Sequence, residues 1–344
     1  MQGAAQMASV ISEAQTSQRK SGYPYWKWPI VIGLSVFLLY LALRGVDWRR
    51  IGSIVARCRV SYLILACSCA ALSYIVRAMR WRILLSAKER LAYTTVLWAS
   101  SVGYLANNYL PARAGELVRT AMISSRSRLS KTYVFTTAMT ERVIEFVILV
   151  LMAFFLSLTL PQRPVWLVRL MLLTTIGALA ATAFFLLLPW VDRARTGFVT
   201  RLSVSGRTKD RLHGIAESVT LALIALRDPL RLFQVCGATT IVWTLDAAAA
   251  VILARALGMH LLFSVAVLLS TGLAIGNALP STPGAVGIFQ FAAVTVLTPF
   301  NYTQTEAIAY ILVAQAAAYV VVTTLGLIGL WRYRLTGTTE TGRL

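Results

Sequence analysis

The stretch that decides the fold is Asn108-Tyr109-Leu110-Pro111-Ala112-Arg113-Ala114-Gly115-Glu116, which interrupts an apolar, helix-forming segment. Proline lacks a backbone donor and breaks a helix, and here it stands at the end of a hydrophobic run over 91–110. A weaker helical stretch, 112–124, follows it. The pattern therefore predicts a broken helix or a re-entrant hairpin near 91–124.

The same pattern returns in the second half of the chain. Asn108-x-Leu110-Pro111-x-x-x-Gly115 is matched by Asn277-x-Leu279-Pro280-x-x-x-Gly284, which lies 169 positions later in a chain of 344 residues. The apolar stretches around each break are offset similarly, so the pattern predicts two related halves and a second hairpin near 261–298. A short match in a turn with glycine and proline can also arise by chance, and that alternative stays open. The residues assigned to the two breaks are Pro111, Gly115, Asn277, Pro280, Pro283 and Gly284.

The composition excludes a soluble enzyme. Hydrophobic residues make up 58% of the chain and charged residues 13%, whereas soluble domains have about 45–50% and about 25%. A bilayer core of about 30 Å needs about 20 apolar residues per helix. With the two hairpins, the spans found by that rule give eight hydrophobic segments in an all-α integral membrane fold. The predicted crossings are 29–44, 60–80, 132–160, 164–190, 232–256 and 305–331.

Charge predicts how the segments are oriented. The chain has 33 Lys and Arg against 13 Asp and Glu, a net charge of +20, and basic residues in short loops stay on the cytoplasmic side. Segments 77–90 and 192–231 are basic, so we place both inside. The first hairpin then enters from the cytoplasmic face and the second, within the uncharged region 261–304, from the outer face. This gives two halves of inverted topology in the cytoplasmic (inner) membrane, with both termini in the cytoplasm.

These segments also divide the chain. We expect a cytoplasmic tail (1–28), a first membrane half (29–160), a second membrane half (161–335) that includes the basic segment 192–231, and a second cytoplasmic tail (336–344). The loop after the first crossing is basic although it lies outside in this topology. We interpret 51–59 as an amphipathic helix that lies on the outer surface.

Three charged residues follow the first break. Arg113 and Glu116 are three positions apart on one face of the short helix, and Arg119 lies one turn further. Arginine matches a pair of phosphate oxygens, and the N-terminal end of a helix attracts an anion. The spacing thus predicts a site for a phosphate-bearing headgroup. The alternative is a structural ion pair between Arg113 and Glu116, with Arg119 extending to the lipid headgroups.

A later crossing carries charge near the middle of the bilayer. Glu141 and Glu145 lie one turn apart with Arg142 beside them, and Asp246 is the only acid in its own crossing. Ionisable residues at this depth are costly and mark functional sites. Glu141, Glu145 and Asp246 are therefore candidates for proton coupling. The alternative is a buried bracing network of Glu141, Arg142, Arg113 and Asp246.

Other chemistry is not indicated. Arg77-x-x-Arg80-Trp81 closes the second crossing and is typical of an interfacial anchor. The four cysteines and two histidines lack the spacing of a metal site, so we expect no metal and no cofactor. No basic stretch interleaves with aromatic residues on a polar domain, which argues against nucleic-acid binding.

Four parts of the sequence together are similar to one known family. They are Arg77-x-x-Arg80-Trp81, Asn107-Asn108-x-Leu110-Pro111-x-Arg113-x-Gly115-Glu116-x-x-Arg119, Glu141-Arg142 and Pro280-x-x-Pro283-Gly284-x-x-Gly287. Roughly from 29 to 335, the chain resembles the lysylphosphatidylglycerol synthetase transmembrane-region family, the flippase-like integral membrane proteins. It departs from the family's pattern at Ala285, where a second glycine is expected, and at Gln290, where an acid is common.

The resemblance implies a flippase that moves an anionic phospholipid, a modified lipid or a polyprenyl-phosphate-linked lipid between leaflets. It covers no synthetase domain, so we expect a transporter and not an enzyme. Two other functions stay open: a non-transporting scaffold for enzymes of lipid or glycan biosynthesis that docks through 192–231, and an intramembrane transferase with Glu141 as a base. The predicted substrate-binding residues are Arg113, Glu116, Arg119, Glu141, Arg142 and Asn108.

Overall fold

The computed structural model describes residues 27–110, 114–160, 164–165, 168–180, 183, 228–278 and 283–339. Within these ranges every regular element is a helix, which confirms the all-α fold class. Nearly all of the expected N-terminal tail and basic segment 192–231, and the last residues of the C-terminal tail, lie outside the described residues. The first described helix already begins at Lys27, and the last one runs to Thr339.

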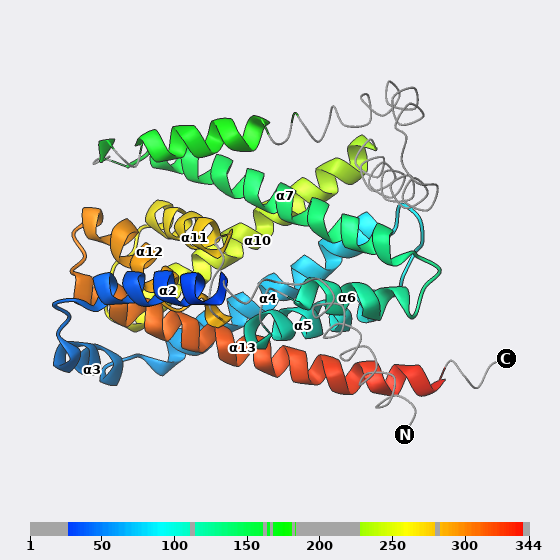
Figure 1. Ribbon diagram of the computed structural model, residues 1–344, viewed down its shortest axis with the longest axis horizontal. Coiled ribbons are helices and arrows are strands. Elements are labelled where there is room, and N and C mark those ends of the chain that lie inside the picture. Colours follow the sequence, from blue (N-terminus) through cyan, green and yellow to red (C-terminus); the bar gives the residue numbers. More distant parts are fainter. Residues whose placement is uncertain are drawn as a thin grey trace.

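Up to Leu85 and again from Pro229 to Thr339, the described helices follow one another along the chain with short connections (Figure 1). Asp47, Ser130 and Asp228 each begin a helix by accepting a hydrogen bond from a backbone N–H of its first turn. An apolar helix also covers Val168–Ala180. The remaining elements are α2 (Lys27–Leu43), α3 (Trp48–Ala56), α4 (Val60–Leu85), α5 (Tyr93–Tyr109), α6 (Gly115–Ser124), α7 (Lys131–Ser157), α10 (Pro229–Ala256), α11 (Phe263–Ala278), α12 (Ile288–Leu297) and α13 (Gln304–Thr339), with 3₁₀ turns at Pro283–Ala285 and Thr298–Phe300.

Three described helices are long and apolar enough to cross a membrane, namely α4, α10 and α13 up to Tyr333. They coincide with the predicted crossings 60–80, 232–256 and 305–331. The predicted crossing 132–160 corresponds to α7, which is 27 residues long but carries Glu141, Arg142 and Glu145 in its central turns. Of the other two predicted crossings, α2 has 17 residues and the helix at Val168–Ala180 is shorter still.

The centre of the molecule is the crossing of α4 and α10. The two helices run antiparallel, and the Arg59 N–H at the start of α4 donates to the Ala256 carbonyl at the end of α10, at 2.9 Å. Small side chains at a helix crossing let the backbones approach closely, and both helices bury several along their length. These are Ala66, Ser73 and Ala78 of α4, and Thr239, Ala247 and Ala254 of α10.

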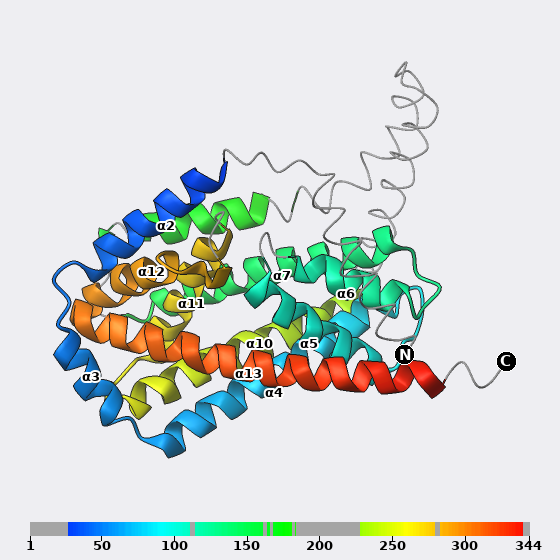
Figure 2. The same ribbon diagram turned by 60° about the horizontal axis from the view of Figure 1, so that its bottom comes forward.

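Two pairs of short helices flank this crossing. α5 packs on α6, and α11 packs on α12. The first pair lies toward one end of the long axis and the second pair toward the other, in both ribbon views (Figures 1 and 2). Between α5 and α6, the Gly115 N–H donates to Asn107 Oδ1 at 2.9 Å, which closes the break with a side chain.

The second break is held by backbone conformation and two amides. Gly284 and Gly287 have φ of +74° and +88°, a region that favours glycine. Gln290 Oε1 accepts from the Gly287 N–H at 2.7 Å, and Gln290 Nε2 lies 2.6 Å from Gln315 Oε1. Gln315 Nε2 in turn donates to the Gly284 carbonyl at 3.0 Å. A chain of neutral hydrogen bonds thus ties the start of α12 to the middle of α13.

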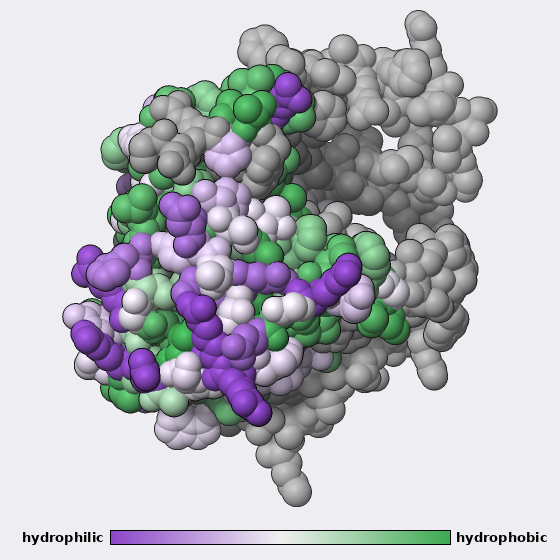
Figure 3. Space-filling view, turned by 90° about the vertical axis from the view of Figure 1, so that its left-hand side faces the viewer, coloured by the Kyte–Doolittle hydropathy of each residue, from purple (hydrophilic) through white to green (hydrophobic). Residues whose placement is uncertain are grey.

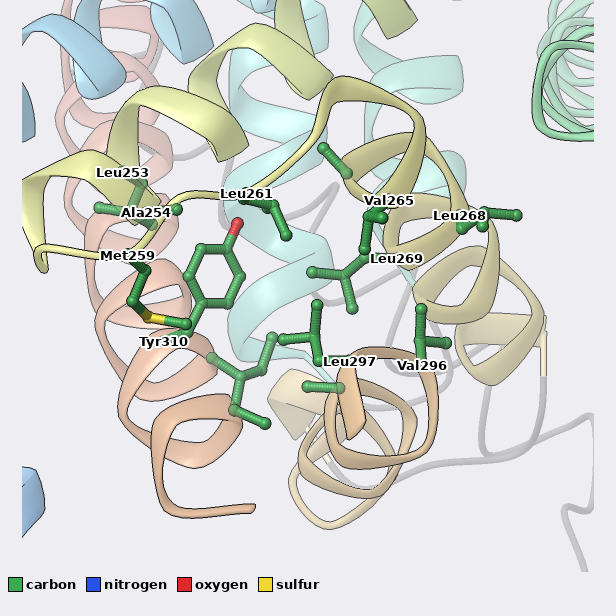
Figure 4. Close-up of a cluster of buried hydrophobic side chains, with 14 of the residues drawn as sticks. Leu253, Ala254, Met259, Leu261, Val265, Leu268, Leu269, Val296, Leu297 and Tyr310 are labelled. Atoms are coloured by element: carbon green, nitrogen blue, oxygen red, sulfur yellow. The ribbon is translucent and has the colours of Figure 1, made fainter. Parts of the chain in front are cut away.

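Apolar side chains fill the space between these elements. One cluster joins α10, α11, α12 and α13 and is drawn in Figure 4. Tyr310 of α13 points into this cluster and donates its hydroxyl to the Ala250 carbonyl at 3.3 Å. A second cluster surrounds the fully buried Trp81 and joins α4, α5, α6 and α7. The two clusters therefore hold the two ends of the bundle separately.

The helix α3 caps one end of the molecule. Asp47 Oδ1 accepts the Arg49 and Arg50 N–H groups at 2.9 and 3.1 Å, and Ile51 is buried while the arginines are exposed. Arg50 also reaches Glu306 of α13 at 3.0 Å. Hydrophilic residues gather on this end of the molecule (Figure 3). The amphipathic helix expected at 51–59 is thus present over Trp48–Ala56.

We expect Gly115→Ala to destabilise the protein. A Cβ at Gly115 would lie 2.0 Å from the Gly103 carbonyl oxygen and 2.5 Å from Asn107 Oδ1, so α5 and α6 must separate. Such overpacking costs about 1–3 kcal/mol. Thermal unfolding of the purified protein in detergent measures it as a lower Tm.

Gly237→Ala is the matched control, because a Cβ at Gly237 in α10 meets nothing within 4 Å. Alanine there gains about 0.5–1 kcal/mol of helix propensity, so the Tm should hold or rise. Equal melting of the two variants would contradict the close approach of α5 and α6.

Candidate functional site

Eight charged side chains meet between α4, α6, α7 and α10, and we call them the charge cluster. Four are arginines and four are carboxylates, so the formal charges cancel. Hydrocarbon solvates no charge, and buried ions in proteins are therefore paired. The members are Arg77 and Arg80 of α4, Glu116 and Arg119 of α6, Glu141, Arg142 and Glu145 of α7, and Asp246 of α10.

Arg80 and Glu141 form the innermost pair. Their side chains are 0% and 1% exposed, and Arg80 Nη2 lies 2.6 Å from Glu141 Oε1. The same Nη2 is 2.7 Å from Glu145 Oε1, while Nη1 donates to Thr239 Oγ1 of α10 at 3.2 Å. One guanidinium thus binds α4 to both α7 and α10.

Arg119 joins α6 to this pair. Its Nη1 lies 3.0 Å from Glu141 Oε2, and its Nη2 lies 2.5 Å from Glu116 Oε2, in an ion pair without hydrogen-bond geometry. The guanidinium lies over the ring of Trp81, 4.5 Å from the centroid. Arg119 Nε has no hydrogen-bond partner among the described residues. Arg119 is thus held in the cluster mainly by its ion pairs and by the ring of Trp81.

Arg142 is the most exposed member, with 35% of its side chain accessible. Its Nη2 lies 2.7 Å from Glu116 Oε1 and its Nη1 lies 2.7 Å from Glu145 Oε2. Its guanidinium stands 6.0 Å from the ring centroid of Tyr104 on α5. Arg142 is therefore the most accessible cation of the cluster.

Arg77 connects the cluster to the carboxylate of α10. It pairs with Glu145 through one nitrogen and with Asp246 Oδ2 at 2.6 Å through the other. Trp243 supports this contact, because its ring lies 5.4 Å from the guanidinium and its Nε1 donates to the Glu145 carbonyl at 3.2 Å. Asp246 is 24% exposed, so the cluster opens to its surroundings at this point as well as at Arg142.

The arrangement can hold the four helices together, or it can bind an anion in exchange for one of its carboxylates. Every arginine is shared between two carboxylates, and a planar guanidinium binds phosphate with the geometry it uses for a carboxylate. A phosphate could therefore replace a carboxylate at one arginine while the other contact persists. The sequence led us to expect arginines that bind a phosphate-bearing headgroup, whereas the four arginines of the charge cluster are neutralised by acids.

The structure brings most of the predicted site residues together. Glu116, Arg119, Glu141 and Arg142 are in direct contact, and the proton-coupling candidates Glu145 and Asp246 join them through Arg77. A bracing network was the stated alternative for several of them. Its expected member Arg113 lies outside the described residues.

The predicted break residues are distributed differently. Asn108 is half-buried near the end of α5, and its neighbour Asn107 makes the hydrogen bond across the break. Asn277 is exposed near the end of α11, and Gly284 follows Pro283 in the 3₁₀ turn. Pro111 and Pro280 lie outside the described residues.

Two predictions about arginines are wrong. We expected Arg77, Arg80 and Trp81 to anchor the end of a crossing at the interface, but Arg80 and Trp81 are fully buried. Side chains of α6, α7 and α10 surround them. The alternative that Arg119 extends to the headgroups also fails, since its side chain is 2% exposed.

The sequence did contain a signal that Arg77 and Arg80 belong to the site. Asp246 follows Arg77 by 169 residues, the offset that separates the two proline breaks. Four buried acids also require more cations than Arg119 and Arg142 supply. Thr239 and Tyr104 carry no comparable signal, because uncharged residues are common in apolar helices.

We expect Arg80→Ala to lower the free energy of unfolding by about 3–5 kcal/mol, because it leaves Glu141 and Glu145 short of a buried partner. Thermal or denaturant unfolding in detergent measures this loss. Arg50→Ala is the control: it removes a pair whose arginine is 52% exposed, so about 0–1 kcal/mol is expected. Similar losses for both variants would show that burial does not set the strength of the cluster.

Comparison with known proteins places the chain in a family. Neither the comparison with curated proteins nor that with solved structures gives a match. Among protein families, residues 28–326 match the one described as lysylphosphatidylglycerol synthase TM region. The match spans α2 to α13 and contains every member of the charge cluster. The chain is thus a multi-pass integral membrane protein that belongs to the lysylphosphatidylglycerol synthase TM region family.

Proposed function

We propose that the protein moves a lipid with an anionic, phosphate-bearing headgroup between the leaflets of the cytoplasmic membrane. The observation that carries this proposal is the charge cluster, which holds four arginines among apolar helices. Ionisable residues at membrane depth usually serve transport or relay charge. The family's association with lipid modification and translocation supports the same function. Substrates of this class include anionic phospholipids, modified lipids and polyprenyl-phosphate-linked lipids.

The headgroup would enter at Arg142 and proceed by exchange of partners. Arg142 is the most exposed cation of the cluster, and its two carboxylates each have a second arginine to retain. Glu116 keeps Arg119, and Glu145 keeps Arg77 and Arg80. A phosphate can therefore take both nitrogens of Arg142 without leaving a carboxylate unpaired in a low-dielectric surrounding.

We further propose that the two halves are an inverted repeat. Val60 and Pro229, the first residues of α4 and α10, are 169 positions apart. In a two-fold arrangement each contact has a reciprocal partner. α5 packs on α13 as α11 packs on α7, and α6 packs on α7 as α12 packs on α13. These reciprocal pairs support the repeat, with α5–α6 and α11–α12 as hairpins that enter from opposite faces.

Residues close to a two-fold axis meet their own counterparts. Arg77 and Asp246 are separated by 169 positions and pair directly. Tyr74 and Trp243 are separated by the same number, and the Arg77 guanidinium lies 6.0 and 5.4 Å from their rings. The axis would therefore pass through the charge cluster. In this arrangement a rocking motion of one half against the other changes the side on which the cluster opens.

The orientation follows from the charges of the loops. We place both termini, and the basic segment 192–231, on the cytoplasmic side. The halves 29–160 and 161–335 then have opposite orientations. The proposed function makes membrane lipid the partner of the protein. Enzymes of lipid or glycan biosynthesis are further candidate partners.

A flipping assay in liposomes tests the proposal. Purified protein is reconstituted with fluorescent phosphatidylglycerol, and dithionite quenching reports how fast lipid reaches the outer leaflet. Wild type should exceed protein-free liposomes. Arg142→Gln should slow flipping by about tenfold or more, because one charge-assisted contact is worth about 1.5–3 kcal/mol.

Arg50→Gln serves as the matched control, since Arg50 lies in α3 and pairs with Glu306, outside the cluster. Its flipping rate should equal that of wild type. If wild type is no faster than empty liposomes, the function is wrong. If Arg142→Gln flips lipid as fast as wild type, the entry site is wrong.

A further inference from the structure

An apolar groove runs along the outside of α7, α10 and α11, and no charged side chain of the described residues lines it. Its volume is about 480 Å³. α7 contributes most of its wall, and α10 and α11 contribute the rest. The lining residues that matter below are Ile148, Met152 and Leu156 of α7, Cys236 and Thr240 of α10, and Phe263 of α11.

The groove offers almost no polar contact to an occupant. The Thr240 hydroxyl donates to the Cys236 carbonyl of its own helix at 3.1 Å, so its hydrogen is already used. Cys236 presents a thiol, which behaves as a small apolar group. Both residues lie in α10, which is long and apolar enough to cross the bilayer. A hydrocarbon chain fits these walls, whereas a headgroup or a peptide backbone would leave polar atoms unpaired.

Two residues that line the groove stand close in the sequence to residues of the charge cluster or their hydrogen-bond partners. Ile148 lies one turn beyond Glu145 on α7, and Thr240 follows Thr239, which accepts a hydrogen bond from Arg80. An α-helix rises about 1.5 Å per residue, so the groove begins about 5 Å along α7 from a carboxylate of the cluster. One lipid molecule can therefore span both, with its phosphate at the arginines and its tail in the groove.

In the proposed repeat, the contact between α5 and α13 corresponds to the contact between α11 and α7. α5 and α13 are packed closely together. A Cβ at Gly326 would lie 2.5 Å from Leu105 Cβ, and one at Gly329 would lie 3.1 Å from the Trp98 carbonyl oxygen. Glycine lets α13 approach α5, whereas Leu156 lines the groove on the other side.

We propose that this groove binds one hydrocarbon tail of the transported lipid, which enters from the bilayer between α7 and α11. The proposal rests on the proposed function, because it assigns the tail of the same substrate. It makes the α7–α11 seam, and not the α5–α13 seam, the lateral entrance in the conformation described here.

Photo-crosslinking tests this assignment. Wild-type protein is incubated in detergent with phosphatidylglycerol that carries a diazirine on one acyl chain, illuminated, and digested for mass spectrometry. Adducts should concentrate on the α7, α10 and α11 residues that line the groove. Thr240→Trp should reduce them to the level of an unilluminated sample. Ile241→Trp, on the same helix and 53% exposed outside the groove, should leave them unchanged.

Cys236 provides a second measurement that needs no bulky variant. In a background with Cys58→Ser, Cys67→Ser and Cys69→Ser, the rate of Cys236 alkylation by a maleimide reports access to the groove. Adding phosphatidylglycerol to delipidated protein should slow alkylation. Adducts spread evenly over the lipid-facing helices, or an alkylation rate unaffected by lipid, would overturn the proposal.

The outcomes of these experiments distinguish a failure of the tail site from a failure of the proposed function. Adducts in the groove together with no flipping by wild type would leave the tail site standing and remove the proposed function. Flipping by wild type with unchanged rates in Thr240→Trp would retain the function and overturn the groove as the path of the tail.

Discussion

The pairing of Arg80 with Glu141 is the constraint from which the rest of the structure follows. Both side chains are buried almost completely, and an unpaired ion in that position would cost several kcal/mol. The pair therefore fixes α4 against α7, and its remaining hydrogen-bonding atoms draw in Thr239, Arg119 and Glu145. Buried ion pairs add little net stability compared with apolar packing. In the function proposed above, these pairs exchange partners with a phosphate.

Part of this architecture could be predicted from residue patterns alone. Proline after an apolar run predicted both helix breaks, and hydropathy located α4, α10 and α13. The same reasoning failed at Arg80 because a hydropathy window ends a crossing at its first charges. α4 continues past Arg80 to Leu85, and only the facing carboxylates of α7 explain why. Which cation meets which acid depends on how four helices pack, and that information is not local.

The two breaks are built with different chemistry. The first lies beside charged residues of α6 and is bridged by Asn107, whereas the second relies on the amides of Gln290 and Gln315. The neutral side chain of Gln290 satisfies the backbone at Gly287 without needing a cation. Seven of the eight members of the charge cluster come from the first half, and Asp246 comes from the second. In the function proposed above, a headgroup would meet charged groups near the first break and neutral amides at the second.

The helix α13 has a mechanical consequence. Glu306 near its start binds Arg50 of α3, Gln315 binds the second break, and Tyr333 receives Arg126 and donates to the Met122 carbonyl beside α6. About 40 Å separates Glu306 from Tyr333 at 1.5 Å per residue. These three contacts join α3, the second break and α6 to one continuous helix. In the rocking motion proposed above, α3, the second break and α6 would therefore move together with α13.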